Sequence, residues 1–298
     1  MKKNVGLLLI FFCLTVLFLG NRSYAAEVDV WDSKAAMQVA RAYLGVAVAD
    51  GKIYAIGGDT SFISANVCPG TVLSYKLVST NEEYDPTTNQ WITKTAMPTA
   101  RALFGITTYQ NKIYCIGGYN TNYTDLSVNE VYDTITDKWC VKASMPSSAY
   151  GVQANTIGNK IYVIGGPTAI GGVGLNVNYV YDIETDSWAS RTLPPHNIAS
   201  LTSAVVGDKI FFIGGFTDVS GLWNGTFVLE AYNTLTDCWS MVASSPVDYE
   251  SGNGGGVTSG SNFSKQFYFF NDEQTYVFNF DNNNWIIGEP MLTARKSV

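Results

Sequence analysis

The chain has 298 residues, enough for one large domain or two ordinary ones, and it carries a formal net charge of −7. It is 13% aromatic and 14% charged, a composition that favours a packed, strand-rich fold over disorder. A net negative charge repels nucleic acid and anionic membrane surfaces, so a nucleic-acid-binding function is excluded.

The first 25 residues are typical of a secretory signal peptide. Lys2 and Lys3 precede the apolar run VGLLLIFFCLTVLFLG at 5–20, and Ser23 and Ala25 are small residues placed for cleavage. The alternative is an uncleaved membrane anchor, but the run is shorter than the roughly 20 residues that a spanning helix needs. We therefore expect a secreted or extracytoplasmic protein whose mature domain, 26–298, does not insert into the membrane. Cleavage would leave 15 basic and 25 acidic side chains, a net charge of −10.

The remaining chain is an array of similar units. One phrase occurs four times, as GKIYAIGG, NKIYCIGG, NKIYVIGG and DKIFFIGG, and a degraded fifth copy, SKQFYFFN, follows at 264–271. A tryptophan closes each unit, and with Trp31 six of the seven tryptophans recur at intervals near 50 residues, at 91, 139, 188, 239 and 285. A fixed period of this length indicates a repeat architecture.

Each unit offers about four short strands rich in Val, Ile, Tyr and Phe. Pairs such as Asp50-Gly51 between the first two strands suit two-residue hairpins. The KIYxIGG strand is apolar at nearly every position, as a strand must be when both faces of its sheet are covered. Four-stranded sheets packed radially against one another meet this need, so the sequence predicts an all-β propeller. Its blades are expected at roughly 40–95, 101–143, 149–192, 198–243 and 252–290.

The order of motifs resembles the kelch repeat: Gly-Gly after an apolar strand, then Tyr-Asp, then Trp, and MPxxR before the next strand. The resemblance covers about 31–298 and implies that the strand beginning at each Trp is the outermost, fourth strand of its blade. On this pattern VDVW at 28–31 is a fourth strand without its first three, and MLTARKSV at 291–298 starts a further blade. We expect a C-terminally truncated piece of a six-blade ring, with a closed five-blade ring as the alternative.

Ligand-binding residues are expected on the face that carries the loops after Gly-Gly and the MPxxR segments. These loops differ from copy to copy, and variable loops on a rigid frame are where binding usually occurs. Trp223, the tryptophan outside the period, suits stacking on a sugar or anchoring a partner, and Tyr119 and Tyr123 suggest the same role; packing over its own blade is the alternative for Trp223.

Three arginines occupy equivalent places at the channel mouth: Arg41, Arg101 and Arg295. Together they could hold a carboxylate or a sulfate. Kelch repeats often carry an arginine here for internal hydrogen bonding, and we favour that structural role over ligand binding.

The residues favour a binding module over an enzyme. Kelch copper radical oxidases need two histidine ligands, whereas this chain has a single histidine, His196, so no metal and no cofactor are predicted. The predicted function is an extracytoplasmic kelch platform for a protein or glycan ligand. The alternative is a sugar-modifying kelch enzyme such as a sialic-acid mutarotase, for which an arginine arc would suit an acidic sugar.

Overall fold

The computed structural model describes residues 32–61, 76–166, 176–195, 202–213, 216–217, 224–225, 228–244, 255–258, 266–271, 274–290 and 292. The predicted signal peptide at 1–25, the strand expected at 28–31 and nearly all of the segment 291–298 lie outside these residues. Within the described part of the chain, no helix combines the length and the hydrophobicity that crossing a bilayer requires.

The described residues fold into β-strands joined by turns and loops. The strands are β1 Gly45–Ala49, β2 Lys52–Ile56, β3 Asn81–Asp85, β4 Gln90–Lys94, β5 Gly105–Tyr109, β6 Lys112–Ile116, β7 Asn129–Asp133, β8 Lys138–Lys142, β9 Val152–Ile157, β10 Lys160–Gly165, β11 Val177–Asp182, β12 Ser187–Ser190, β13 Thr202–Val206, β14 Lys209–Ile213, β15 Phe216–Thr217, β16 Asn224–Gly225, β17 Val228–Asn233, β18 Cys238–Ser244, β19 Gly255–Thr258, β20 Gln266–Asn271, β21 Gln274–Asn279 and β22 Asn284–Ile287.

These strands form five four-stranded antiparallel sheets in sequence order. The sheets are β1-β2-β3-β4, β5-β6-β7-β8, β9-β10-β11-β12, β13-β14-β17-β18 and β19-β20-β21-β22, and β15 pairs with β16 inside the connection between β14 and β17. The predicted all-β fold with five four-stranded blades is confirmed.

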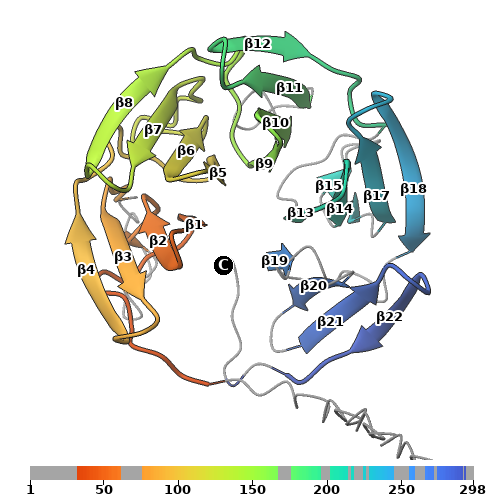
Figure 1. Ribbon diagram of the computed structural model, residues 1–298, viewed down its shortest axis with the longest axis horizontal. Coiled ribbons are helices and arrows are strands. Elements are labelled where there is room, and N and C mark those ends of the chain that lie inside the picture. Colours follow the sequence, from red (N-terminus) through yellow and green to blue (C-terminus); the bar gives the residue numbers. More distant parts are fainter. Residues whose placement is uncertain are drawn as a thin grey trace, which may run out of the picture. The chain divides into compact units, whose positions relative to one another are not determined.

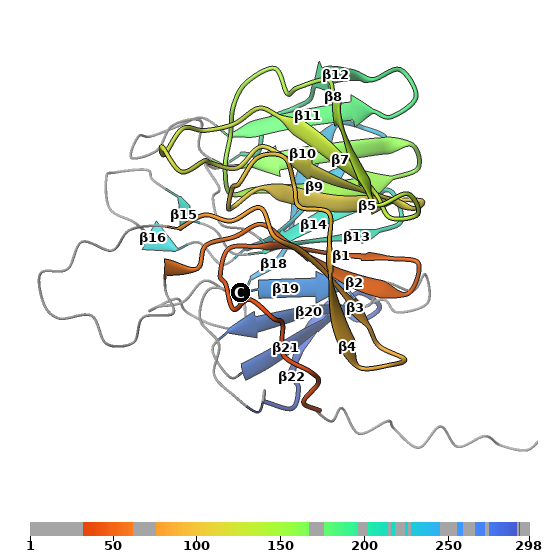
Figure 2. The same cartoon turned by 90° about the vertical axis from the view of Figure 1, so that its left-hand side faces the viewer.

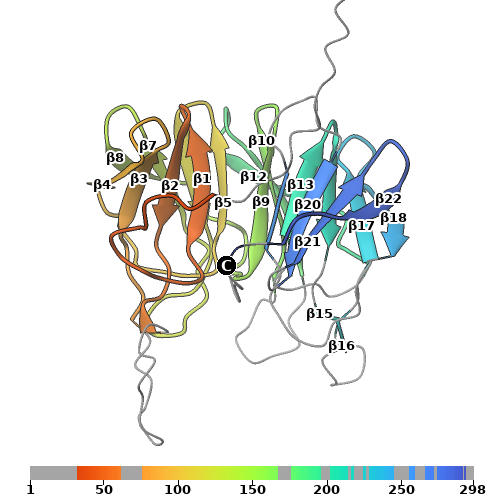
Figure 3. The same cartoon turned by 90° about the horizontal axis from the view of Figure 1, so that it is seen from below.

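The five sheets stand around a common axis, with the first strand of each sheet innermost and the fourth outermost (Figure 1). First strands of consecutive sheets contact one another: β1 with β5, β5 with β9, β9 with β13 and β13 with β19. Seen from the side, the strands run along the axis, so all turns and loops gather at its two ends (Figure 2). One end carries the hairpins between first and second strands, and β15–β16 extends beyond the other end (Figure 3).

The hairpin end is built by short turns. Ala49 pairs with Lys52, leaving Asp50 and Gly51 as a two-residue loop with φ of 50° and 71°. Two positive φ values in a two-residue loop define a type I′ turn, whose twist matches that of the flanking strands. The predicted hairpin therefore forms at this pair.

The second strands are buried on both faces, as their continuous apolar sequence predicts. On β6, Ile113 and Cys115 lie in the core between the first and second sheets, whereas Tyr114 and Ile116 lie in the core between the second and third. All four side chains are nearly inaccessible to solvent. Burying an isoleucine completely stabilises a fold by about 2–3 kcal/mol, so these strands supply much of the energy that holds neighbouring sheets together.

The periodic tryptophans join each sheet to the one before it. Trp139 Nε1 donates to the carbonyl of Thr95, in the segment that leaves β4, at 2.8 Å. Asp137 accepts from the Thr95 N–H at 2.9 Å and from the Tyr132 hydroxyl at 2.6 Å. The same arrangement recurs at Trp91, Trp188 and Trp239 with their own Asn or Asp partners. The predicted recurrence of the indoles between neighbouring sheets is confirmed.

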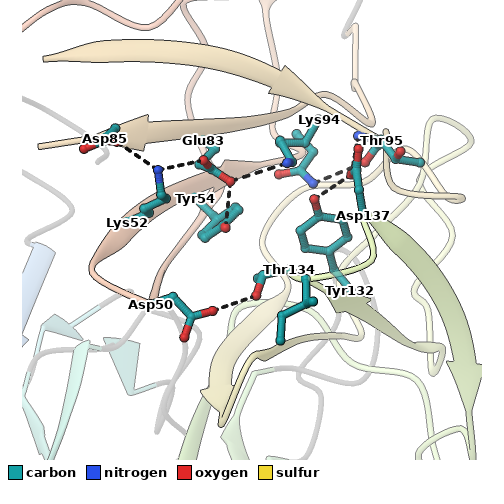
Figure 4. Close-up of polar contacts among 12 residues, drawn as sticks. Asp50, Lys52, Tyr54, Glu83, Asp85, Lys94, Thr95, Tyr132, Thr134 and Asp137 are labelled. Carbon is teal, nitrogen blue, oxygen red and sulfur yellow. Dashed lines mark hydrogen bonds and ion pairs between the residues drawn. The ribbon is translucent and has the colours of Figure 1, made fainter. Parts of the chain in front are cut away.

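A polar cluster lies beside this junction between the first two sheets (Figure 4). Glu83 is 6% exposed and stands where the next two sheets have Val131 and Val180. Its carboxylate accepts from the Tyr54 hydroxyl at 2.8 Å and lies 3.3 Å from Lys52 Nζ and 3.6 Å from Lys94 Nζ. Burial, followed by the bond to Glu83, raises the pKa of Tyr54.

Candidate functional site

The end opposite the hairpins carries the connections between second and third strands and those between sheets, and we call it the loop face. The Gly-Gly pairs build it by docking on the next sheet. Gly58 N donates to the Arg101 carbonyl at 2.9 Å, and Gly118 N donates to the Ala149 carbonyl at 2.8 Å. Gly117 has φ of 70°, and a Cβ there would lie 2.5 Å from Ala149 O, so only glycine permits this approach.

Arg101 is completely buried beneath the loop face. Its Nη2 donates to Glu130 Oε2 at 2.9 Å and to the Cys115 carbonyl at 3.0 Å, and its Nη1 donates to the carbonyls of Gly117 and Val128. Desolvation lowers the pKa of Arg101 from its ordinary value, but an arginine beside a carboxylate stays protonated. The guanidinium therefore ties β6, β7 and the Gly-Gly turn together.

Arg41 makes the equivalent arrangement in the first sheet. Its Nη1 donates to Glu82 Oε2 and to the Val39 carbonyl, and its Nη2 donates to the Ala55 carbonyl at 2.7 Å. The side chains of Arg41 and Glu82 are at most 1% exposed. Arg41 and Arg101 thus direct their donors inward, which favours the structural role over a ligand-binding arc. Arg295 lies outside the described residues.

The third sheet replaces this ion pair with neutral side chains. Ala149 stands in the place of Arg101, since its carbonyl accepts from the preceding Gly-Gly turn in the same way. Tyr179 stands in the place of Glu130, and its hydroxyl lies 3.0 Å from Ser147 Oγ, where Thr99 Oγ1 donates to Glu130 at 2.7 Å. Arginine and glutamate are therefore lost together.

Three tyrosines gather on the loop face between the second and third sheets. The rings of Tyr119 and Tyr123 are parallel within 6°, with centroids 6.3 Å apart, and Tyr150 meets Tyr119 edge-on at 5.9 Å. Tyr123 is 48% exposed, whereas Tyr119 and Tyr150 are partly buried. The Asn120 side chain holds the loop by accepting from the N–H groups of Asn122 and Thr124. The structure thus brings the predicted Tyr119 and Tyr123 together.

Asp125 completes the group, which we call the tyrosine cluster: Tyr119, Tyr123, Tyr150 and Asp125. Asp125 forms an isolated antiparallel bridge with Tyr119, flanked by the bonds Leu126 N to Gly118 O and Asn120 N to Thr124 O. Directly opposed residues of this kind present their side chains on the same face at close range. The Asp125 Oδ1 atom is buried and has no hydrogen-bond partner among the described residues.

Desolvation raises the pKa of Asp125 above its ordinary value, and no neighbouring cation in the described part of the chain offsets it. Burial and then the Asp125 charge raise the pKa of Tyr150. The cluster therefore combines ring surface with a partly exposed carboxylate that no neighbouring cation in the described part of the chain compensates.

Sequence reasoning missed Tyr150 and Asp125. Tyr150 stands where the second sheet has the fully buried Ala102, so its departure from the repeat was the available signal. Trp223 and His196 lie outside the described residues, so their predicted roles stay predictions.

The described residues contain no group of three or more His, Cys, Asp or Glu side chains placed to hold a metal ion. Cys115 is a buried core residue, and desolvation raises the pKa of its thiol to about 12, which keeps it protonated at neutral pH. Cys140 and Cys238 are free and exposed.

Comparison with known families agrees with this architecture. The model of the KLHDC2/KLHL20/DRC7 Kelch-repeats domain matches residues 103–293, and the Kelch motif matches residues 40–98. Kelch-like protein 28 of Homo sapiens is 32% identical over 97 residues, which cover 33% of this chain and 16% of that protein. Kelch-like protein 15 of Mus musculus is 31% identical over 103 residues, which cover 33% of this chain and 15% of that protein.

Among solved structures, that of YjhT superimposes with a TM-score of 0.69 and covers 87% of each chain at 16% sequence identity, a likeness of fold. The in-phase repeat, the five sheets and the family match over residues 103–293 lead to one conclusion: this protein belongs to the kelch-repeat β-propeller family.

Proposed function

We propose that this protein is an extracytoplasmic binding module that recognises a glycan or protein ligand through its loop face. The observation that carries the proposal is the tyrosine cluster, because exposed aromatic side chains on a rigid frame are suited to stacking and anchoring. The signal-peptide pattern at 1–25 supports export.

Of the two ligand classes, a glycan fits the cluster better. Tyr123 offers ring surface that is about half exposed, and the partly exposed Asp125 of the same cluster offers a carboxylate that can accept a hydrogen bond. A sugar presents an apolar ring face for stacking and hydroxyl groups that donate hydrogen bonds at its edge. The single cluster is also small compared with the roughly 800 Å² per partner that stable protein complexes bury.

The alternative of a sialic-acid mutarotase gains no support from the described arginines. An acidic sugar would need cationic groups facing the ligand, whereas Arg41 and Arg101 are engaged with Glu82, Glu130 and backbone carbonyls. We therefore propose binding without chemical conversion of the ligand.

A glycan array with the purified exported protein tests the proposal. We expect binding to a defined subset of glycans that falls at least about tenfold in Tyr123→Ala, since truncating an aromatic anchor of a binding site costs about 2 kcal/mol or more. The matched control is Ile135→Ala, which removes a 75% exposed apolar side chain from the β7–β8 turn at the opposite end of the same sheet. Equal loss in both variants, or full retention in Tyr123→Ala, would contradict the proposal.

A further inference from the structure

We propose that the tyrosine cluster selects sugars that carry a protonated amino group, hexosamines, over neutral and acidic sugars. The inference rests on the proposed function and gives it a ligand class. It starts from the one charged group of the cluster, Asp125, and from the three rings around it.

The Asp125 side chain is only partly buried, so a cation from outside the protein can approach it. Its Oδ1 atom is buried without a partner among the described residues, although a buried acceptor that stays unsatisfied costs about 1–3 kcal/mol. A ligand ammonium that contacts this partly exposed side chain can compensate its charge, and a charge-assisted hydrogen bond is about twice as strong as a neutral one.

The rings favour the same ligand charge. Tyr119 is paired directly with Asp125, the rings of Tyr123 and Tyr150 contact the Tyr119 ring, and the faces of aromatic rings attract cations. Partial desolvation strengthens both the ring–cation and the carboxylate–cation attraction, because the local dielectric is lower than that of water. The raised pKa of Asp125 has the same origin, since burial without a cation disfavours its charged form.

Acidic sugars meet the opposite conditions. The two channel-mouth arginines that the structure describes, Arg41 and Arg101, are buried and paired with Glu82 and Glu130. The chain as a whole carries a net charge of −7. A carboxylate or sulfate at the cluster would therefore meet the negative Asp125 side chain, and neither of these arginines is free to balance it.

The test compares ligands that differ only in the amino group. Glucosamine oligosaccharides, their N-acetylated counterparts of equal length and sialylated oligosaccharides are titrated by calorimetry into the wild-type protein, Asp125→Asn and Glu184→Gln. Asp125→Asn removes the charge and keeps the shape, and Glu184→Gln makes the same change in net charge at an exposed position in the β11–β12 turn. We expect the wild type and Glu184→Gln to bind glucosamine oligosaccharides about tenfold tighter than the acetylated ones, and Asp125→Asn to bind both about equally.

Each other outcome is decisive. The wild type could bind glucosamine oligosaccharides and their N-acetylated counterparts equally well, with binding still lost in Tyr123→Ala. That result overturns the selection by charge and leaves the proposed function standing. Preference for sialylated ligands overturns it as well. The absence of any Tyr123-dependent glycan binding overturns the inference together with the proposed function. Tighter, Asp125-dependent binding of a lysine-rich peptide would assign the cation site to a protein ligand and overturn the hexosamine assignment.

Discussion

Replacing Arg101 by alanine tests whether the channel-mouth arginines belong to the frame or to a ligand site. The substitution removes a completely buried cation and leaves Glu130, which is 2% exposed, without its charge partner. It also removes the donors that serve the carbonyls of Cys115, Gly117 and Val128. Removing one partner of a buried pair destabilises a protein by about 3–5 kcal/mol, so we expect a loss of that size.

The third sheet supplies the compensating change. Because Ala149 and Tyr179 occupy the places of Arg101 and Glu130, the double variant Arg101→Ala/Glu130→Tyr rebuilds an arrangement that the protein already uses. Thr99 can then meet the new tyrosine hydroxyl as Ser147 meets Tyr179. We expect the double variant to be more stable than Arg101→Ala by about 2 kcal/mol, within the range of couplings between contacting residues.

Urea unfolding followed by tryptophan fluorescence measures both effects in one double-mutant cycle with Glu130→Tyr. Lys138→Ala, which removes an exposed cation from β8, is the control and should change the free energy of unfolding by less than about 0.5 kcal/mol. The structural role would be refuted if Arg101→Ala lost less than about 1 kcal/mol, or if the two single effects added without coupling. Retained glycan binding in the stable double variant would further separate Arg101 from ligand recognition.

Three other substitutions test the frame. Gly117→Ala forces a side chain into φ of 70° and within 2.5 Å of Ala149 O, so it should destabilise by at least about 2 kcal/mol in thermal unfolding; an unchanged midpoint would contradict the docking of the Gly-Gly turn. Glu83→Val should destabilise by about 1–3 kcal/mol in urea unfolding, because it leaves the buried Tyr54 hydroxyl without its acceptor; an unchanged free energy of unfolding would instead show that valine is accommodated here as it is in the next two sheets. Lys112→Met should cost less than about 1 kcal/mol at pH 5, since the Lys112 hydrogen bond lowers the pKa of Asp133 from 3.8 to about 2 in a solvent-screened pair. The difference in the free energy of unfolding between the wild type and Lys112→Met is present above the pKa of Asp133 in the unfolded chain and should shrink as the pH falls from 4 through 2. A difference that stays constant over this range would refute the stabilising role of the pair.

Most of the frame could be predicted because it repeats. The continuous apolar second strand, read at 112–116, predicts burial on both faces, and Ile113 and Tyr114 indeed lie in two different cores. The period of the tryptophans predicts indoles at matching places, and Trp139 and Trp188 make the same bond to the preceding connection. Each of these signals is local in sequence and recurs in several copies, so neighbouring copies support one another.

The arginine geometry was harder to predict because it depends on a partner far along the chain. Arg101 and Glu130 are 29 residues apart, and no local pattern joins them. A comparison of the first three copies contains the signal all the same, since the first and second sheets have both charges and the third has neither, although the fourth keeps Glu230 without an arginine in this place. The joint loss at Ala149 and Tyr179 indicates an internal pair more directly than the arginine alone does.

The loop face carries its candidate site where the repeat is broken. In the second sheet, Arg101 is followed by the completely buried Ala102, which bridges Tyr119. In the third sheet the neutral Ala149 is followed by Tyr150, whose ring packs edge-on against Tyr119. The frame contacts are kept at this junction, since Gly118 still docks on the Ala149 carbonyl. The side chain after it is therefore not required to repeat, and a large aromatic there adds surface to the face without disturbing the sheets. In a repeat fold, positions that depart from the period while the surrounding backbone contacts persist are where ligand recognition should be sought.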